Sequence, residues 1–203
     1  MADQCSSSHL DLYWVPLGAG ARVVRTSGRL YEAIVAAACH RPRQDLYHSA
    51  LVAHTDEGRY CIEMAPIPDG RGVARGVVAE GPVAMKALGR IRVFRYEVRR
   101  WLGGDIPDLP YAVASPVRIT CLDSEIRSVL DLVALVPTPV WGRDELRTGE
   151  MWNSNSVVSW VLAQAGLLER AGRPPRNGRT PGWEAGIVVA RRRGVRGSLE
   201  RRS

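Results

Sequence analysis

The chain of 203 residues is 45% hydrophobic and 24% charged, which is ordinary for one globular domain with a sizeable core. It shows no N-terminal signal and no run of about 18 apolar residues, so we expect neither secretion nor a membrane span. A disulfide framework or a structural zinc site is not indicated, because the four cysteines are scattered and form no CxxC motif: Cys5, Cys39, Cys61 and Cys121. Cysteines that form no disulfides fit the reducing environment of the cytoplasm, so we expect a cytoplasmic protein.

The net charge of +7 is unevenly distributed along the chain. Residues 191–203 contain six arginines and one glutamate, so they supply +5 of it and the remainder is close to neutral. We predict a disordered N-terminus over residues 1–10, one domain over 11–190 and a basic disordered tail over 191–203. Nucleic-acid binding is therefore expected at most through this tail. The sequence does not indicate an oligomeric state.

The first elements are two short strands and a helix, expected at residues 11–16, 21–25 and 29–39. Ser27 is placed to cap the helix. Pro42 ends it, because proline lacks an amide hydrogen and disfavours helix in the residue before it.

Residues 45–66 (DLYHSALVAHTDEGRYCIEMAP) place two apolar runs on either side of a polar turn at residues 56–58. This pattern is typical of a β-hairpin, with a glycine available for the turn. His48 opens the first strand, and Glu63 interrupts the apolar run of the second. An imidazole and a carboxylate that face each other across paired strands can act as a general base and its orienting group.

The middle of the chain predicts strands at residues 77–80 and 91–98, and loops at 68–76 and 101–116. Neither face of the second strand is purely apolar, so we expect it near a sheet edge. A long loop in a compact domain is often a functional cover. A helix is predicted over residues 124–135, with Asp123 or Ser124 as its N-cap.

The second informative stretch is residues 150–168 (EMWNSNSVVSWVLAQAGLL). Its apolar spacing predicts an amphipathic helix with Gly166 as C-cap, and a last element is expected at 183–190. A helix N-terminus is electropositive and stabilises an anion. Ser154 or Ser156 could therefore act as a nucleophile, with His48 as base and Glu63 as its orienting group. The simpler interpretation is that these residues only cap the helix.

The hairpin resembles that of the permuted papain-like hydrolases and acyltransferases of the lecithin:retinol acyltransferase type. Members of that group begin a strand with a catalytic His followed by small and apolar residues, and place a second polar residue in the next strand before Leu-Ala-Pro or similar. YHSALVA and YCIEMAP match this pattern at His48 and Glu63. The family nucleophile is a cysteine in Asn-Cys, followed by two residues and two apolar ones, at the start of a helix. Residues 153–158 (NSNSVV) align with it and place Ser154 at the cysteine position; the register through Ser156 fits less well.

The resemblance implies an α+β fold, in which a small antiparallel sheet containing the hairpin packs against the helix that starts at Ser154. It also implies acyl transfer on a small-molecule or peptide amide or ester. Serine ionises far less readily than cysteine, so His48 would have to act as a true general base. Three readings remain open: a serine version of the hydrolase, a catalytically inactive binding module, or a Cys→Ser change made to inactivate the protein.

The sequence indicates no cofactor and no metal site. The four histidines do not cluster with carboxylates at ligand spacing: His9, His40, His48 and His54. We expect His40 and His54 at the surface.

Overall fold

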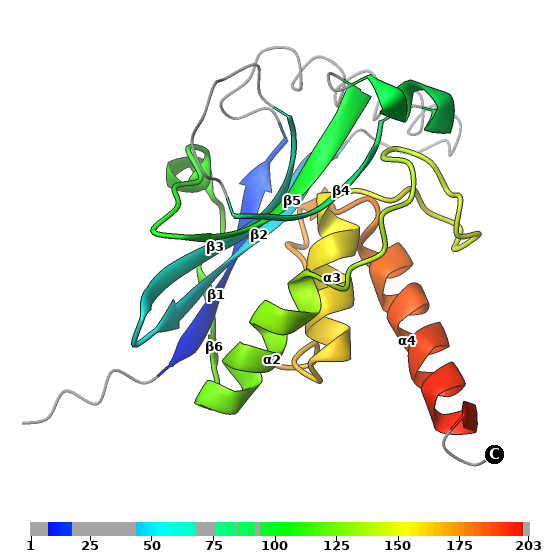
Figure 1. The fold of residues 1–203 in the computed structure, drawn as a ribbon. Helices are drawn as coiled ribbons and strands as arrows, with labels where there is room; N and C mark the ends of the chain where they lie inside the picture. Colours follow the sequence, from blue (N-terminus) through cyan, green and yellow to red (C-terminus); the bar gives the residue numbers. More distant parts are fainter. Residues whose placement is uncertain (1–7, 18–43, 68–75, 84, 92–93, 201–203) are drawn as a thin grey trace, which may run out of the picture.

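The computed structural model describes residues 8–17, 44–67, 76–83, 85–91 and 94–200 (Figure 1). The strand expected at 21–25 and the helix expected at 29–39 lie outside these residues. The described residues form a seven-stranded sheet. Its strands are β1 (His9–Pro16), β2 (Asp45–Thr55), β3 (Gly58–Pro66), β4 (Val77–Pro82), β5 (Arg95–Leu102), β6 (Val117–Thr120) and β7 (Gly178–Arg179).

The strand order is β4-β5-β3-β2-β1-β6, with antiparallel pairing throughout this path, while β7 pairs with β2 in parallel. The helices are α2 (Asp123–Val133), α3 (Ser154–Gln164) and α4 (Trp183–Glu200), together with the short 3-10 helices η1 (Lys86–Arg90) and η3 (Leu109–Tyr111). The predicted α+β class is confirmed, and the sheet is larger than the small one expected.

The core lies between one face of the sheet and the α-helices on that side of it, where α2 and α3 contact the strands and α4 packs on α3 (Figure 1). Alternate strand residues point into it, as the two-residue period of a strand requires. They include Leu10, Leu12 and Trp14 of β1, Leu51 and Ala53 of β2, Ile62 and Met64 of β3, and Tyr96 and Val98 of β5. Among the described residues, the opposite, outer face holds a smaller apolar cluster, which includes Ala50, Val52 and Cys61.

Helix α3 is enclosed on all sides, so the predicted amphipathic pattern is wrong. Every residue from 154 to 162 is buried, because the sheet, α2 and α4 all contact this helix. The small polar residues on the remaining sides of the helix therefore contact other protein atoms instead of water. Ser159, for example, donates a hydrogen bond to the Trp183 carbonyl at 2.7 Å. The predicted stop is confirmed, since Gly166 adopts φ +71° directly after the C-cap.

The hairpin is confirmed, with Leu51 opposite Ile62 and the turn between Thr55 and Gly58. The expected edge position of the fifth strand is wrong: β5 lies between β3 and β4, and β4 is the edge. Charged side chains do not mark an edge in this strand, because the outer face of β5 buries those of Glu97 and Arg99.

Several boundaries differ from the predictions. Strand β1 begins at His9, inside the N-terminus expected to be disordered, and the strand expected at 91–98 is β5 at Arg95–Leu102. Leu122 is the N-cap of α2, and its amide donates to the Glu125 carboxylate at 2.8 Å, so no capping side chain at Asp123 or Ser124 is needed. Helix α4 continues to Glu200, so most of the predicted disordered tail 191–203 is helical. Arg192 contributes to this, because its guanidinium donates to the carbonyl of Leu146 at 2.6 Å.

We expect Gly182→Ala to destabilise the start of α3 more than Gly172→Ala destabilises its own turn. Both glycines have positive φ, +85° and +69°, so each alanine carries a backbone cost of about 1–2 kcal/mol. A Cβ at 172 meets nothing within 4 Å, whereas one at 182 would lie 2.5 Å from Asn153 Oδ1 and 2.7 Å from Ser156 Oγ. The loss of that cap adds about 1 kcal/mol or more. Urea unfolding of both variants measures the difference, and equal losses would contradict this account.

Candidate functional site

Strands β2 and β3 separate along the first half of β2, and the start of α3 lies at the resulting gap. Their pairing runs only from Leu51–Ile62 to Thr55–Gly58, and beyond Ile62 the described pairing of β3 is with β5. The Leu46 carbonyl accepts from Leu17 on the β1 side at 2.7 Å, so the next carbonyl, that of Tyr47, points into the gap.

The side chain of Asn155 fills the place of a strand partner there. Its Nδ2 donates to the Tyr47 carbonyl at 2.9 Å. Just before it along β2, Asp45 and Leu46 pair with β7. The unpaired edge of β2 is thus completed by β7 and by the first turn of α3, which fixes where that turn lies relative to His48.

The first turn of α3 is held by a network of buried amides. Asn153 is the N-cap, and its Oδ1 accepts from the Asn155 amide at 2.9 Å and from the Ser156 amide at 3.4 Å. Its Nδ2 donates to the Pro181 carbonyl at 2.8 Å, and Asn155 Nδ2 also donates to that carbonyl at 2.9 Å. The segment before α4 is therefore anchored to the start of α3.

Of the two candidate nucleophiles, the hydroxyl of Ser156 is engaged in structure. Ser156 is fully buried, donates to the Gly182 carbonyl at 2.7 Å and accepts from the Asn153 amide at 3.1 Å. Ser154 is the first residue of the helix and is 7% exposed. Within the described residues its hydroxyl makes no hydrogen bond. Of the two serines, Ser154 is therefore the one whose hydroxyl is available to act as a nucleophile.

His48 follows Tyr47 on β2 and, by strand alternation, shares the outer face with Ala50 and Val52. It is partly buried. Burial lowers the pKa of its ring below the usual range, and the negative charge of Asp108 acts in the opposite direction. No hydrogen bond joins its ring to Ser154 Oγ in the described structure. The fold brings the two segments together but leaves this contact unmade.

Glu63 is bound to an arginine that the sequence analysis did not consider. Its Oε1 accepts from Arg99 Nη1 at 2.7 Å, and Arg99 Nε donates to Glu97 Oε2 at 3.0 Å. Burial raises the pKa of the Glu63 carboxyl, and Arg99 opposes that shift. The negative charge of Asp108 acts on both Glu63 and His48. Asp108 belongs to the predicted loop 101–116. The length of that loop was the one feature of the sequence that pointed to a functional role for it.

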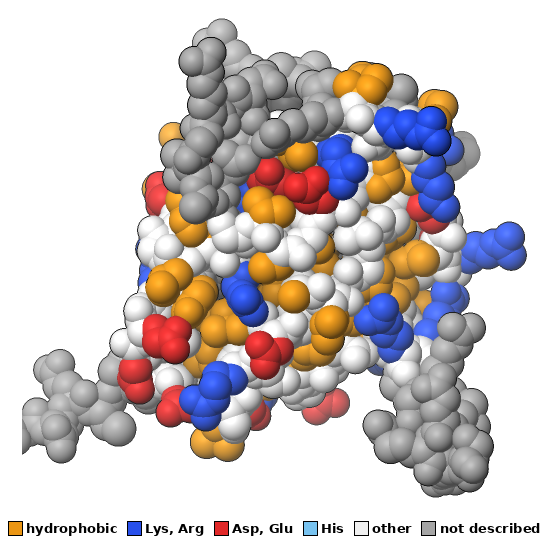
Figure 2. Space-filling model, viewed as in Figure 1, with side chains coloured by type: hydrophobic (Ala, Val, Ile, Leu, Met, Phe, Trp, Pro, Cys, Tyr) orange, Lys and Arg blue, Asp and Glu red, His pale blue; other side chains and the backbone are white. Residues whose placement is uncertain are grey.

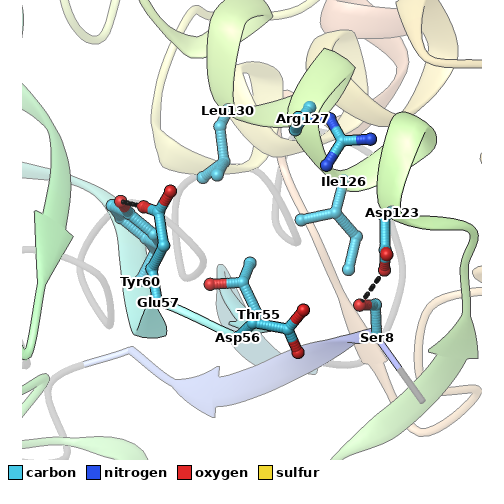
Figure 3. A pocket seen from close by; sticks show the side chains of 9 residues that line it. All are labelled: Ser8, Thr55, Asp56, Glu57, Tyr60, Asp123, Ile126, Arg127 and Leu130. Carbon is cyan, nitrogen blue, oxygen red and sulfur yellow. Dashed lines mark hydrogen bonds between the residues drawn. The ribbon is translucent and has the colours of Figure 1, made fainter. Parts of the chain in front are cut away.

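A separate hollow of about 160 Å³ lies between the turn of the hairpin and α2 (Figure 3). Asp56 and Tyr60 line its hairpin side, and Ile126 and Arg127 line its helix side. Because the turn is at the other end of β2 from His48, this hollow is not the predicted site.

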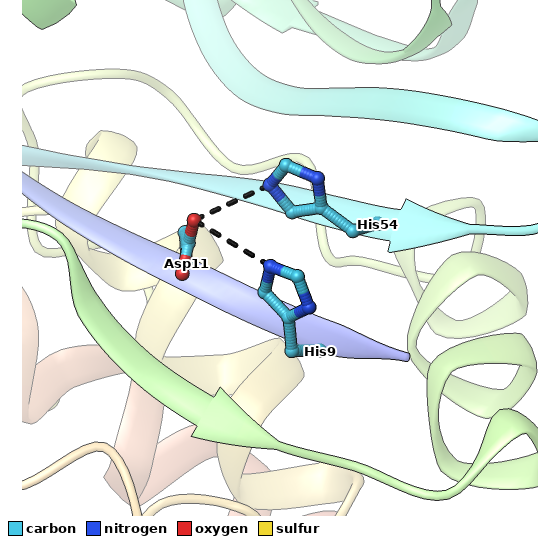
Figure 4. Close-up of side chains that lie close together, drawn as sticks. All are labelled: His9, Asp11 and His54. Carbon is cyan, nitrogen blue, oxygen red and sulfur yellow. Dashed lines mark ion pairs between the residues drawn. The ribbon is translucent and has the colours of Figure 1, made fainter. Parts of the chain in front are cut away.

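The structure also brings together three side chains that the sequence analysis had not connected: His9, Asp11 and His54 (Figure 4). His54 was expected at the surface, yet its ring stacks on that of His9 with centroids 4.2 Å apart. The expectation of no clustered metal ligands was wrong for these residues.

No family model, no curated protein and no solved structure matches this chain. Among the described helices, none combines the length and apolar character needed to cross a membrane.

We expect Arg99→Met to cost about 3–5 kcal/mol of unfolding free energy, because it removes the cation that is shared by the largely buried carboxylates of Glu97 and Glu63. Arg95→Met is the matched control on the same strand. Arg95 pairs with Glu80 at 2.9 Å, but both side chains are more than one-third exposed, 35% and 39%. Its loss should be about 1 kcal/mol or less. Chemical denaturation of the two variants checks this, and similar losses would show that the Arg99 cluster contributes little.

Proposed function

We propose that the chain is a hydrolase or acyltransferase that acts on an amide or ester of a small molecule or peptide, with Ser154 as nucleophile and His48 as general base. The observation that supports this most is the bond from Asn155 to the Tyr47 carbonyl, which holds the start of α3 beside the residue that precedes His48. The permuted papain-like resemblance implies the same two segments, in the same chain order.

The local electrostatics support acyl transfer. The N-terminus of α3 carries partial positive charge, which favours the Ser154 alkoxide and an oxyanion next to it. Asn153 Oδ1 takes the amides of Asn155 and Ser156, so we assign the amide of Ser154 as the oxyanion donor. His48 with a lowered pKa is neutral near pH 7 and can accept a proton.

In the proposed reaction, Ser154 Oγ attacks the carbonyl carbon of the substrate while its proton passes to His48. His48 then gives that proton to the leaving amine or alcohol, and an acyl-serine remains. Water or a second acceptor attacks this ester and regenerates Ser154. Glu63 is paired with Arg99, so in this scheme Asp108 is the carboxylate whose charge acts on the His48 imidazolium.

We expect a fluorophosphonate probe to label Ser154, because its hydroxyl is the one in the first turn of α3 without a structural hydrogen bond. Intact-mass and peptide mass spectrometry measure the adduct. Ser154→Ala should abolish it, and His48→Gln should slow it by about 100-fold or more. Ser156→Ala is the matched control: it should lower stability while labelling persists at residue 154. If the parent chain forms no adduct, the proposal that Ser154 is a catalytic nucleophile is contradicted.

We expect the labelling rate at pH 6.5 to exceed half of its plateau value. The base must be neutral to act, so the rate rises as pH rises through the pKa of His48. Burial moves this pKa below its ordinary value of 6.5, which places the inflection on the acid side of that value. A rate profile between pH 5 and 8, measured on the folded chain, checks this. An inflection above 6.5 would contradict the role assigned to His48.

A second candidate is a catalytically inactive binding module that uses the same gap. Two observations favour it: Ser154 is only 7% exposed, and no hydrogen bond joins it to His48 in the described structure. Under this reading the labelling experiment gives no adduct for the parent chain. Ser154→Cys is then alkylated without producing turnover.

We also propose a cytoplasmic setting, which fits the two free, buried thiols of Cys61 and Cys121. Nucleic acid is not proposed as a partner. On the described part of the face in Figure 2, basic and acidic side chains are interspersed with hydrophobic ones. In the basic segment of α4, Arg192 and Arg193 donate to main-chain carbonyls of this chain.

A further inference from the structure

The cluster of His9, Asp11 and His54 lies on the outer face of the sheet, where β1 begins and β2 ends. His9 and His54 are directly opposite each other in the ladder, and Asp11 follows two residues along on the same face of β1. One ligand atom from each residue lies within 4.8 Å of the other two (Figure 4). The cluster is therefore positioned by the strand register of β1 and β2.

We propose that this cluster binds a divalent transition-metal ion such as Zn²⁺ or Co²⁺ through the two imidazoles and the Asp11 carboxylate. Two histidines and one carboxylate are a common ligand set for such ions, with the remaining positions filled by water. Nε2 of His54 lies 3.3 Å from Asp11 Oδ2, and Nε2 of His9 lies 3.8 Å from the same oxygen. Both rings thus direct the same nitrogen toward one buried carboxylate (Figure 4).

Arg118 is the competitor for this site. Its guanidinium binds Asp11 through two bonds, Nε to Oδ1 at 3.0 Å and Nη2 to Oδ2 at 3.1 Å. The Arg118 side chain is 59% exposed and comes from β6, so it can turn into solvent without disturbing the core. A bound cation is repelled by this positive charge, and binding should tighten when the charge is removed.

The simpler account of the cluster is an ion pair in which one histidine proton is shared with Asp11. That account explains the short distances and requires no metal. It predicts that neutralising Arg118 has no effect on metal affinity. The two accounts therefore differ in a measurement that does not depend on any enzymatic activity.

The metal site is independent of the proposed acyl-transfer site. His54 lies six residues beyond His48 on β2, and six strand residues span about 20 Å. A single ion cannot contact both histidines, so failure of either proposal leaves the other standing.

The test is a Co²⁺ titration of the full chain, followed by visible absorption, with Zn²⁺ added afterwards to displace it. We expect d–d bands of a four- or five-coordinate ion in the parent chain. Affinity should rise about tenfold or more in Arg118→Gln, since a like charge near the ion is removed. It should fall about tenfold or more in both His9→Gln and His54→Gln. His48→Gln is the control and should titrate like the parent chain.

The proposal is overturned if neither the parent chain nor Arg118→Gln develops these bands. It is also overturned if the bands survive His54→Gln or carry a thiolate-to-cobalt charge-transfer band, because the ion is then bound by cysteine. The test uses variants of the two histidines and not Asp11→Asn, because Asp11 is only 2% exposed and its substitution would disturb the fold.

Discussion

The bond between the Tyr47 carbonyl and the Asn155 side chain is the constraint on which the proposed site depends. Once β3 has left β2, this carbonyl has no strand partner, and a buried carbonyl without a donor is costly. Asn155 supplies the donor from the second residue of α3. This bond therefore places the start of the helix at the gap. Asn153 and the Pro181 carbonyl then hold the turn in the same place.

The outer face of the sheet is organised by charge, in contrast to the apolar face under the helices. Arg99 lies between Glu63 and Glu97, with all three partly or fully buried. Buried ion clusters seldom add net stability compared with apolar residues of similar size. They do fix side-chain positions strongly, because breaking them is expensive. In the proposed reaction the charge that favours the His48 imidazolium comes from Asp108, which lies outside this cluster.

Local sequence patterns predicted the hairpin, α2 and α3 because each of these depends on residues close together in the chain. The surroundings of α3 were not predictable in this way, since its apolar spacing does not show that three elements enclose it. The same limit applies to the sites. His48 and Glu63 lie in one hairpin, so their shared outer face could be inferred from alternation. Arg99 reaches Glu63 only through the β3–β5 pairing.

The His9–Asp11–His54 cluster shows most clearly why register matters. Nothing in the sequence near His9 indicates that His54 is its cross-strand partner, because the connection between β1 and β2 is long and sets no register by itself. A shift of one residue would turn His54 to the helix face and leave Asp11 with His9 and Arg118 only. The ladder runs without interruption from His9–His54 to Pro16–Tyr47. The register that assembles the proposed metal ligands at one end therefore also presents the Tyr47 carbonyl to Asn155 at the other.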